Sequence, residues 1–149
     1  MNNFVYNIPT KVYFGENQLG NLAKELLKFG RRVLMTYGGG SIKRIGLYDR
    51  VVGELQAAGI ELYELSGIEP NPRIESVRKG AEMCKEHNID VLLAVGGGST
   101  LDATKFMAAG ACVDHDPWEF FGANAKPIER ALPIVTILTL SATGSEMDS

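Results

Sequence analysis

Short apolar runs alternate with amphipathic segments along most of this chain. The runs are rich in valine, isoleucine and leucine, which is typical of buried β-strands, and they cover residues 32–37, 60–65, 91–95 and 133–140. The segments around them place apolar residues three and four positions apart, which predicts helices over residues 17–29, 48–58, 73–87 and 99–109. The chain is therefore predicted to alternate between helix and strand.

Smaller signals refine this pattern near its ends. Asn88 follows the third predicted helix and suits the left-handed conformation that often stops a helix. Asp116 and Pro117 have the form of an N-cap and a first-turn proline, which predicts a short helix. Near the amino terminus, residues 4–6 and 11–14 are rich in β-forming residues, so we expect a short β-hairpin there.

Strands that alternate with helices at short intervals predict an α/β fold, a doubly wound parallel sheet with helices on both faces. Successive parallel strands joined through helices cross over in the right-handed sense. Ligands of such sheets bind beyond the carboxyl ends of the strands. Each glycine-rich or hydroxyl-rich loop of this chain follows a predicted strand. We therefore expect these loops to open onto one edge of the sheet.

The composition is that of a globular domain with a substantial core. The chain has 149 residues, of which 45% are hydrophobic and 22% charged, and its net charge is −3. A slight negative charge gives no reason to expect a nucleic acid or an anionic membrane as partner. No transmembrane run or signal-peptide pattern is visible, which predicts a cytoplasmic protein. Cys84 and Cys112 are interpreted as reduced residues, with a single disulfide as the alternative.

Residues 96–99, Gly-Gly-Gly-Ser, connect the apolar run 91–95 to a predicted helix. Without Cβ atoms the backbone can bend sharply and approach a ligand, and the helix start offers unpaired N–H groups and the positive end of the helix dipole. These features favour a phosphate site over a simple turn, because three glycines exceed what a turn needs. Ser99 could cap the helix or contact phosphate. Asp102 could complete a capping box or reach a hydroxyl or amide of the ligand.

A second Gly-Gly-Gly-Ser segment, residues 38–41, follows the strand predicted at 32–37. Many dinucleotide sites carry an acidic residue at such a strand end, where it binds the ribose 2′-hydroxyl. Here that acid is missing, and Lys43 and Arg44 follow instead. Glycines, a hydroxyl group and cations suit a 2′-phosphate. The alternative is a solvent-exposed loop with ordinary surface charges.

Clustered hydroxyl groups follow the last predicted strand, within residues 136–146. They could donate to phosphate or to a carboxamide, whereas β-propensity and a capping box of Thr143 and Glu146 explain the same residues without a ligand. The position of Asn71 between two prolines is explained by a turn alone. His87 and His115 are too far apart to predict a metal site by themselves.

Taken together and in this order, these motifs resemble the iron-containing alcohol dehydrogenase family. The resemblance runs over the whole chain and is carried by residues 13–15, 69–72, 96–102 and 143–146. Residues 38–43 and 116–121 are similar to the branch of butanol dehydrogenases and NADPH-dependent aldehyde reductases.

The resemblance implies a two-domain enzyme that interconverts primary alcohols and aldehydes, such as butanol and butanal. Residues 1–149 would form its Rossmann-like amino-terminal domain, which binds NAD(H) or NADP(H). A helical domain that holds iron or zinc would follow. The resemblance also makes a homodimer the expected assembly.

Motif by motif, the resemblance assigns parts of the cofactor to residues of this chain. The diphosphate would contact Gly97, Gly98 and Ser99. The cofactor would extend toward its nicotinamide along Asp102, Thr139 and Thr143. Its adenosine half would be surrounded by four further residues, namely Gly38, Gly39, Ser41 and Asn71.

The family's metal ligands, an aspartate and three histidines, belong to the helical domain, and we find none of them in this chain. We therefore expect neither a catalytic residue nor a metal ligand here, and no dehydrogenase activity from these 149 residues alone. Two alternatives remain open. One is a glycerol or polyol dehydrogenase of the same superfamily, and the other is a stand-alone nucleotide-binding module without catalysis.

Overall fold

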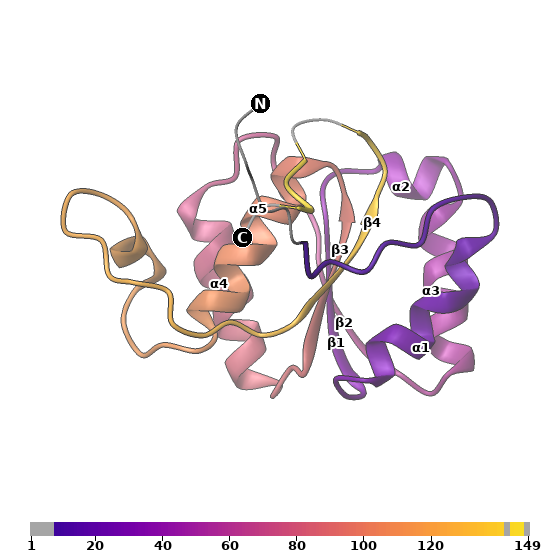
Figure 1. The fold of residues 1–149 in the computed structure, drawn as a ribbon, viewed down its shortest axis with the longest axis horizontal. Coiled ribbons are helices and arrows are strands. Elements are labelled where there is room, and N and C mark those ends of the chain that lie inside the picture. The colour runs from indigo at the N-terminus through magenta and orange to yellow at the C-terminus, as the bar shows by residue number, and fades with distance from the viewer. Residues whose placement is uncertain (1–7, 142–143, 148–149) are drawn as a thin grey trace, which may run out of the picture.

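The computed structural model of this chain describes residues 8–141 and 144–147. Its centre is a sheet of four strands, all paired in parallel, in the order β2-β1-β3-β4 (Figure 1). The strands are β1 (Arg32–Tyr37), β2 (Glu61–Leu65), β3 (Val91–Gly96) and β4 (Ile134–Leu138). The predicted α/β class and the predicted positions of the strands are confirmed.

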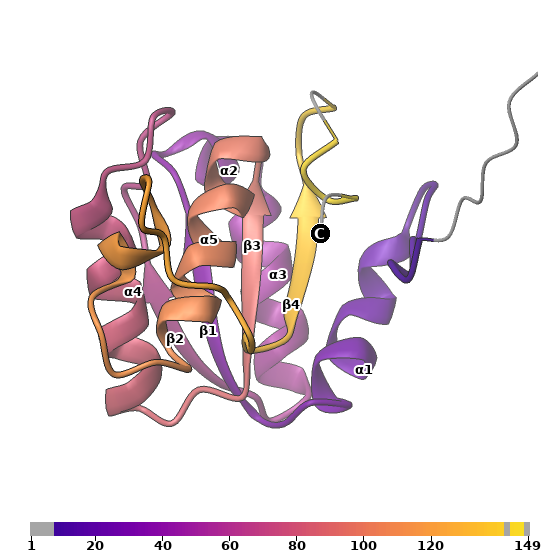
Figure 2. The same cartoon turned by 60° about the vertical axis from the view of Figure 1, so that its left-hand side comes forward.

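Helices cover both faces of the sheet (Figures 1 and 2). One face carries α1 (Leu22–Leu27), α2 (Ser41–Arg44) and α3 (Leu47–Ala57), and the other carries α4 (Ile74–Glu86) and α5 (Gly98–Gly110). Two short 3₁₀ helices complete the described part of the chain: η1 (Gln18–Asn21) leads into α1, and η2 (Pro117–Phe120) packs against α4 and α5.

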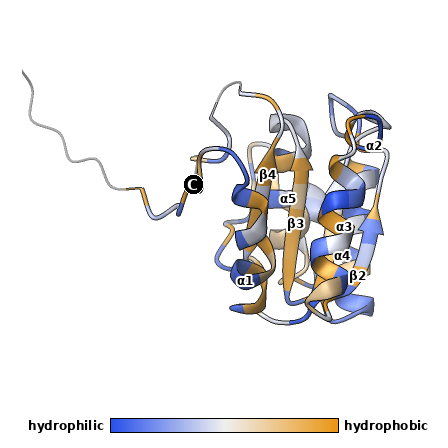
Figure 3. Cartoon of the chain, turned by 90° about the vertical axis from the view of Figure 1, so that its right-hand side faces the viewer, coloured by the Kyte–Doolittle hydropathy of each residue, from blue (hydrophilic) through white to orange (hydrophobic). Residues whose placement is uncertain are grey.

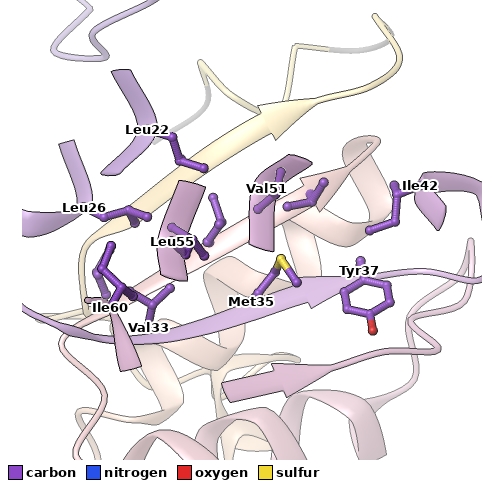
Figure 4. Close-up of a cluster of buried hydrophobic side chains, with 12 residues drawn as sticks. Leu22, Leu26, Val33, Met35, Tyr37, Ile42, Val51, Leu55 and Ile60 are labelled. Carbon is purple, nitrogen blue, oxygen red and sulfur yellow. The ribbon is translucent and has the colours of Figure 1, made fainter. Parts of the chain in front are cut away.

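The two inner strands, β1 and β3, separate two apolar cores. Val33 and Met35 of β1 point into the core beneath α1 and α3 (Figure 4), whereas Leu34 points into the core beneath α4 and α5. All three side chains are fully buried. A strand that is buried on both faces needs apolar residues at successive positions, which explains the continuous apolar runs in the sequence. Figure 3 shows β3 and β4 coloured as hydrophobic, next to helices with hydrophilic stretches on their surfaces.

Two of the smaller signals are confirmed. Asn88 has a φ of 51°, in the left-handed region, immediately beyond the end of α4. The Asp116 carboxylate accepts a hydrogen bond from the backbone N–H of Trp118 at 3.0 Å and so caps η2, with Pro117 at its first position.

The predicted amino-terminal hairpin is wrong in the part that the structure describes. Residues 11–14 form no strand, and residues 4–6 lie outside the described residues. Residues 11–14 are held by side chains instead. The Lys11 ammonium donates to the Glu25 carboxylate at 2.8 Å, and the Tyr13 hydroxyl donates to the same group. The hydrogen bonds from Lys11, Lys28 and Tyr13 lower the pKa of Glu25 to about 2.

Two helices also differ from the prediction. The helix predicted over residues 17–29 begins as the 3₁₀ helix η1, which follows Asn17 in the left-handed region at φ 58°, and continues as α1. The helix α2 was not predicted at all. It has only 4 residues, which is too short for an apolar periodicity to be recognisable.

The thiols of Cys84 and Cys112 are free. Burial raises the pKa of Cys84 to about 12. Within the described ranges, no helix combines the length and the apolar character that crossing a bilayer requires.

Candidate functional site

The strand order reverses between β1 and β3, and this switch point defines the candidate site. From β1 the chain continues to β2 on one side, whereas β3 lies on the other side of β1. The ends of the two inner strands are neighbours, since Tyr37, the last residue of β1, pairs with Val95, the next-to-last residue of β3. The loops that follow therefore diverge from one point at the carboxyl edge of the sheet, where open α/β sheets bind their ligands. Both loops are the Gly-Gly-Gly-Ser segments singled out in the sequence.

The loop after β3 ends at the amino terminus of a long helix. Gly97 is the N-cap of α5, which has 13 residues, and it has no side chain that could accept hydrogen bonds from the first turn. The N–H groups of Gly98, Ser99 and Thr100 occupy that first turn, where an α-helix offers unpaired donors and the positive end of its dipole. This geometry suits an anion such as a diphosphate.

The capping roles considered for Ser99 and Asp102 are wrong. Ser99 lies inside α5, one residue beyond its start, and its hydroxyl donates to the carbonyl of Pro70 at 2.5 Å. Since Gly97 is the N-cap, the third helical position is Thr100, so Asp102 lies beyond the place of a capping-box acid. Asp102 is exposed on the surface of α5. Its carboxylate is therefore accessible to a ligand at this edge.

Glycine is present at positions 96 and 97 for two different physical reasons. A Cβ atom at Gly96 would lie 2.8 Å from the Thr100 hydroxyl oxygen, so packing against α5 demands glycine there. Gly97 has φ −92°, which any residue adopts, and a Cβ on it would make an ordinary contact of 3.9 Å with Leu140. Neither packing nor backbone conformation requires Gly97. A glycine there keeps the start of the helix uncovered, as a bound diphosphate would need.

The loop after β1 is fixed by the chain that leaves β2. The Gly38 carbonyl accepts a hydrogen bond from Gly67 at 2.9 Å, and a Cβ on Gly38 would lie 3.1 Å from the carbonyl oxygen of Ile68. Gly39, in contrast, has open space where a Cβ would be. Ser41 is exposed and begins α2. The loop therefore presents an open surface at Gly39 and Ser41, next to an anchored Gly38.

A polar cluster that the sequence analysis missed lies at the same strand end. The hydroxyl groups of Tyr37 and Tyr48 each donate to one carboxylate oxygen of Glu64, both at 3.0 Å. The Lys43 ammonium lies over the two rings, 5.7 Å from the centroid of Tyr37 and 4.8 Å from that of Tyr48. Burial, followed by the hydrogen bond to Glu64, raises the pKa of Tyr37 to about 12. The sequence signal that could have revealed this cluster is Glu64, an acidic residue within a predicted β-strand.

The remaining candidates that the structure describes, Thr139 and Asn71, lie at the same edge. The backbone N–H of Thr139, just after β4, donates to the Gly96 carbonyl at 2.9 Å, which places Thr139 beside the second glycine loop. Asn71 is exposed, and its neighbour Pro70 is tied to α5 through Ser99. Thr143 lies outside the described residues. The structure thus brings Thr139 and the Asn71 loop to the α5 start, and it leaves Gly38, Gly39 and Ser41 across the switch point.

Comparison with known proteins is consistent with this geometry. Residues 9–149 match the family model of the iron-containing alcohol dehydrogenases. The chain belongs to the iron-containing alcohol dehydrogenase family. The resemblance expected from the sequence motifs is confirmed.

Relatives in this family are named for both nicotinamide cofactors. NADH-dependent butanol dehydrogenase A of Clostridium acetobutylicum is 54% identical over 148 residues, which are 99% of this chain and 38% of that protein. The NADPH-dependent aldehyde reductase YqhD of Escherichia coli is 43% identical over 151 aligned positions, which cover 100% of this chain and 38% of that protein. The chain thus spans little more than a third of the length of these relatives.

Solved structures in the family share this fold. The NADH-dependent butanol dehydrogenase A of Thermotoga maritima superposes with a TM-score of 0.90 at 46% identity, covering 97% of this chain and 36% of that one. The matched part is an α/β unit with a four-stranded parallel sheet and helices on both faces, as described above.

Proposed function

We propose that this chain is the cofactor-binding part of a metal-dependent alcohol dehydrogenase or aldehyde reductase that uses NAD(H) or NADP(H). The observation that carries the proposal is the uncapped start of α5 at the switch point, where Gly97 leaves the first-turn N–H groups open. The names of the relatives supply the chemistry, since they are butanol dehydrogenases and an aldehyde reductase.

In this proposal the two glycine loops bind the two ends of the cofactor. Gly97, Gly98 and Ser99 hold the diphosphate through backbone N–H groups, because these groups stay in place without any side chain that must reorganise. The nicotinamide half extends along α5 and the end of β4, toward Asp102, Thr139 and Thr143. The adenosine half lies at the β1 loop, among Gly38, Gly39, Ser41 and Asn71.

The preference for one cofactor depends on the β1 loop. Gly39 carries no carboxylate that would bind a ribose 2′-hydroxyl or repel a 2′-phosphate. The side chain of Arg44 lies nearby, 3.4 Å from where a Cβ on Gly40 would be. Lys43 is held over two aromatic rings. The loop therefore accepts either form of the cofactor, with Arg44 as the cation placed for a 2′-phosphate.

The protein part described here positions a cofactor and does not itself react. When bound, the nicotinamide ring supplies the hydride chemistry, and the iron or zinc of the whole enzyme is a Lewis acid for the alcohol oxygen. In the part of the chain that the structure describes, no group of three or more His, Cys, Asp and Glu residues could hold a metal ion. We propose that the metal ligands belong to the remaining part of the enzyme, and that these 149 residues alone do not turn over alcohol.

The cofactor site can be tested on the 149-residue chain by nuclear magnetic resonance. ADP-ribose, which is the cofactor without its nicotinamide, is titrated to millimolar concentration while the backbone amide signals are followed. The largest changes are expected at residues 97–100. Changes confined to the groove lined by Asn17, Asp49 and Glu54, between η1 and α3, would contradict the proposal.

A further inference from the structure

Two buried threonine hydroxyl groups lie directly beneath the candidate site. Among the described residues, the buried polar side chains are Thr36, Thr100, Thr104 and Ser145. Thr36 is the next-to-last residue of β1, and Thr104 lies on α5. Both are fully buried, and their hydroxyl oxygens are 2.6 Å apart. A polar pair in this position needs an explanation, because the surrounding core is apolar.

We propose that Thr36 and Thr104 are positioning residues that hold the first turn of α5 in the orientation that binds the cofactor diphosphate. This inference rests on the proposed cofactor site. It assigns to the two residues a role in ligand binding that goes beyond packing of the core.

The direction of the hydrogen bonds follows from counting protons. The pair has two hydroxyl protons to share among three contacts. The two hydroxyl oxygens contact each other, the Thr104 hydroxyl lies 2.7 Å from the carbonyl oxygen of Thr100, and the Thr36 hydroxyl lies 3.5 Å from the carbonyl oxygen of Leu93. The contact with Leu93 is too long to compete. Thr36 therefore donates to Thr104, and Thr104 donates to the carbonyl of Thr100.

This hydrogen-bond chain joins β1 to the first turn of α5. Thr100 is the third residue of α5, so its carbonyl belongs to the turn that presents the open N–H groups. The side chain of Thr100 also fills the space that a Cβ on Gly96 would occupy, at 2.8 Å. Besides the bond from Ser99 to the Pro70 carbonyl, the first turn is thus held at two points of the sheet, by β3 through Gly96 and by β1 through Thr36 and Thr104. Both strands end at the switch point.

As a consequence, the N–H groups at the start of α5 point in one fixed direction. Without the hydroxyl pair, the apolar contacts of α5 with the sheet remain, but among the described residues no other side-chain hydrogen bond joins the first turn to β1. A hydrogen bond is strongly directional whereas apolar packing is not. Loss of the pair is therefore expected to reduce ligand binding more than stability.

The experiment uses the 149-residue chain with ADP-ribose as the probe and the double variant Thr36→Val, Thr104→Val. Replacing both partners by groups of the same shape leaves no buried hydroxyl unpaired, so the variant is expected to fold with nearly unchanged thermal stability. Its Kd for ADP-ribose is expected to rise about tenfold, because the amides lose their alignment with the diphosphate. The chain with Thr36→Ser and Thr104→Ser, which keeps both hydroxyl groups, is expected to recover the affinity of the original chain.

A matched control is Ser76→Ala, which removes a hydroxyl group from α4, on the same face of the sheet as α5 and outside the residues proposed to bind the cofactor; it is expected to keep the original affinity. If the double variant keeps the original affinity, the inference is overturned while the proposed function stands. If the unmodified chain shows no amide changes at residues 97–100, the proposed function itself has failed. If the double variant does not fold, the Kd for ADP-ribose is compared between the serine chain and the single variant Thr36→Val. The single variant is expected to bind more weakly, because it lacks the bond from β1 to Thr104. Equal Kd values for these two chains would overturn the inference.

Discussion

The loops after β1 and β3 have the same four residues, Gly-Gly-Gly-Ser, and follow equally buried strands, yet they form different structures. After β3 the glycines lead into α5, a helix of 13 residues. After β1 they lead into α2, which has 4 residues. Gly46, with φ 76°, separates α2 from α3. The residues that follow a glycine loop therefore decide whether it ends in a strong helix dipole.

We propose that this difference gives the two loops different chemical roles. The first turn of a long, uncapped helix binds a diphosphate through backbone N–H groups. The short helix α2 offers side chains instead: its Lys43 lies over Tyr37 and Tyr48, which donate to Glu64, and we propose that this end of the site faces the ribose 2′-position. The following predictions test that division, from the largest expected effect to the smallest.

The largest effect is expected from Gly97→Asp. The new carboxylate caps α5 and stabilises the helix by about 0.5–1 kcal/mol. It also occupies the diphosphate position with negative charge, so the Kd for ADP-ribose is expected to rise about 100-fold. Calorimetric titration and thermal unfolding measure the two effects on the same samples. In the matched variant Gly40→Asp, at the N-cap of α2, affinity is expected to change less than about twofold, because four residues make only a weak dipole. Equal losses in both variants would show that the two loops do not differ.

The second effect concerns stability. Gly96→Ala places a Cβ 2.8 Å from the hydroxyl oxygen of the buried Thr100. We expect a loss of about 1–3 kcal/mol, as is usual for overpacking. Gly39→Ala, where the Cβ meets open space, is expected to change the free energy of unfolding by less than about 0.5 kcal/mol. Urea denaturation of the two variants checks this, and similar values would argue against a close fit of Gly96 on α5.

The third effect concerns the 2′-position. Gly39→Asp is expected to lower the affinity for 2′-phospho-ADP-ribose relative to ADP-ribose by about tenfold, because the carboxylate repels the phosphate and accepts from a 2′-hydroxyl. Gly39→Asn has the same shape without the charge and is the control. An unchanged ratio of the two Kd values would remove residues 38–44 from the 2′-site.

The smallest effect is confined to alkaline pH. The pKa of Tyr37 is raised from 10.0 to about 12 by burial and by the hydrogen bond to Glu64. The protonated phenol is therefore favoured in the folded chain, and its stabilising effect is fully present below the unfolded pKa of about 10 and is lost as the pH rises toward 12. Tyr37→Phe is expected to lose stability less steeply over this pH range. Urea denaturation at several pH values compares the two chains, and parallel curves would contradict the assignment.

Local signals in the sequence predicted much of this molecule. Continuous apolar runs identified β1 and β3, because strands buried on both faces have no polar side. Asn88 and Asp116 were predicted correctly because a helix end is determined by one or two residues. The strand predicted at residues 11–14, as the second strand of a hairpin, was wrong, because β-propensity does not supply a neighbouring strand.

The sequence alone determined the four strands of the sheet, the longer helices, the fold class and the family, since periodicity, glycine loops and motif order can be recognised without the tertiary structure. Only the tertiary structure decided the hydrogen bond of the Ser99 hydroxyl. Its acceptor, the carbonyl of Pro70, is 29 positions away in the sequence, and the local pattern around Ser99 suggested a helix cap instead. The tertiary structure also decided that Thr36 meets Thr104 and that Glu64 meets two tyrosines. Such contacts depend on which strands are neighbours in the sheet. The strand order results from the packing of the two apolar cores on its faces, and no local sequence pattern specifies it.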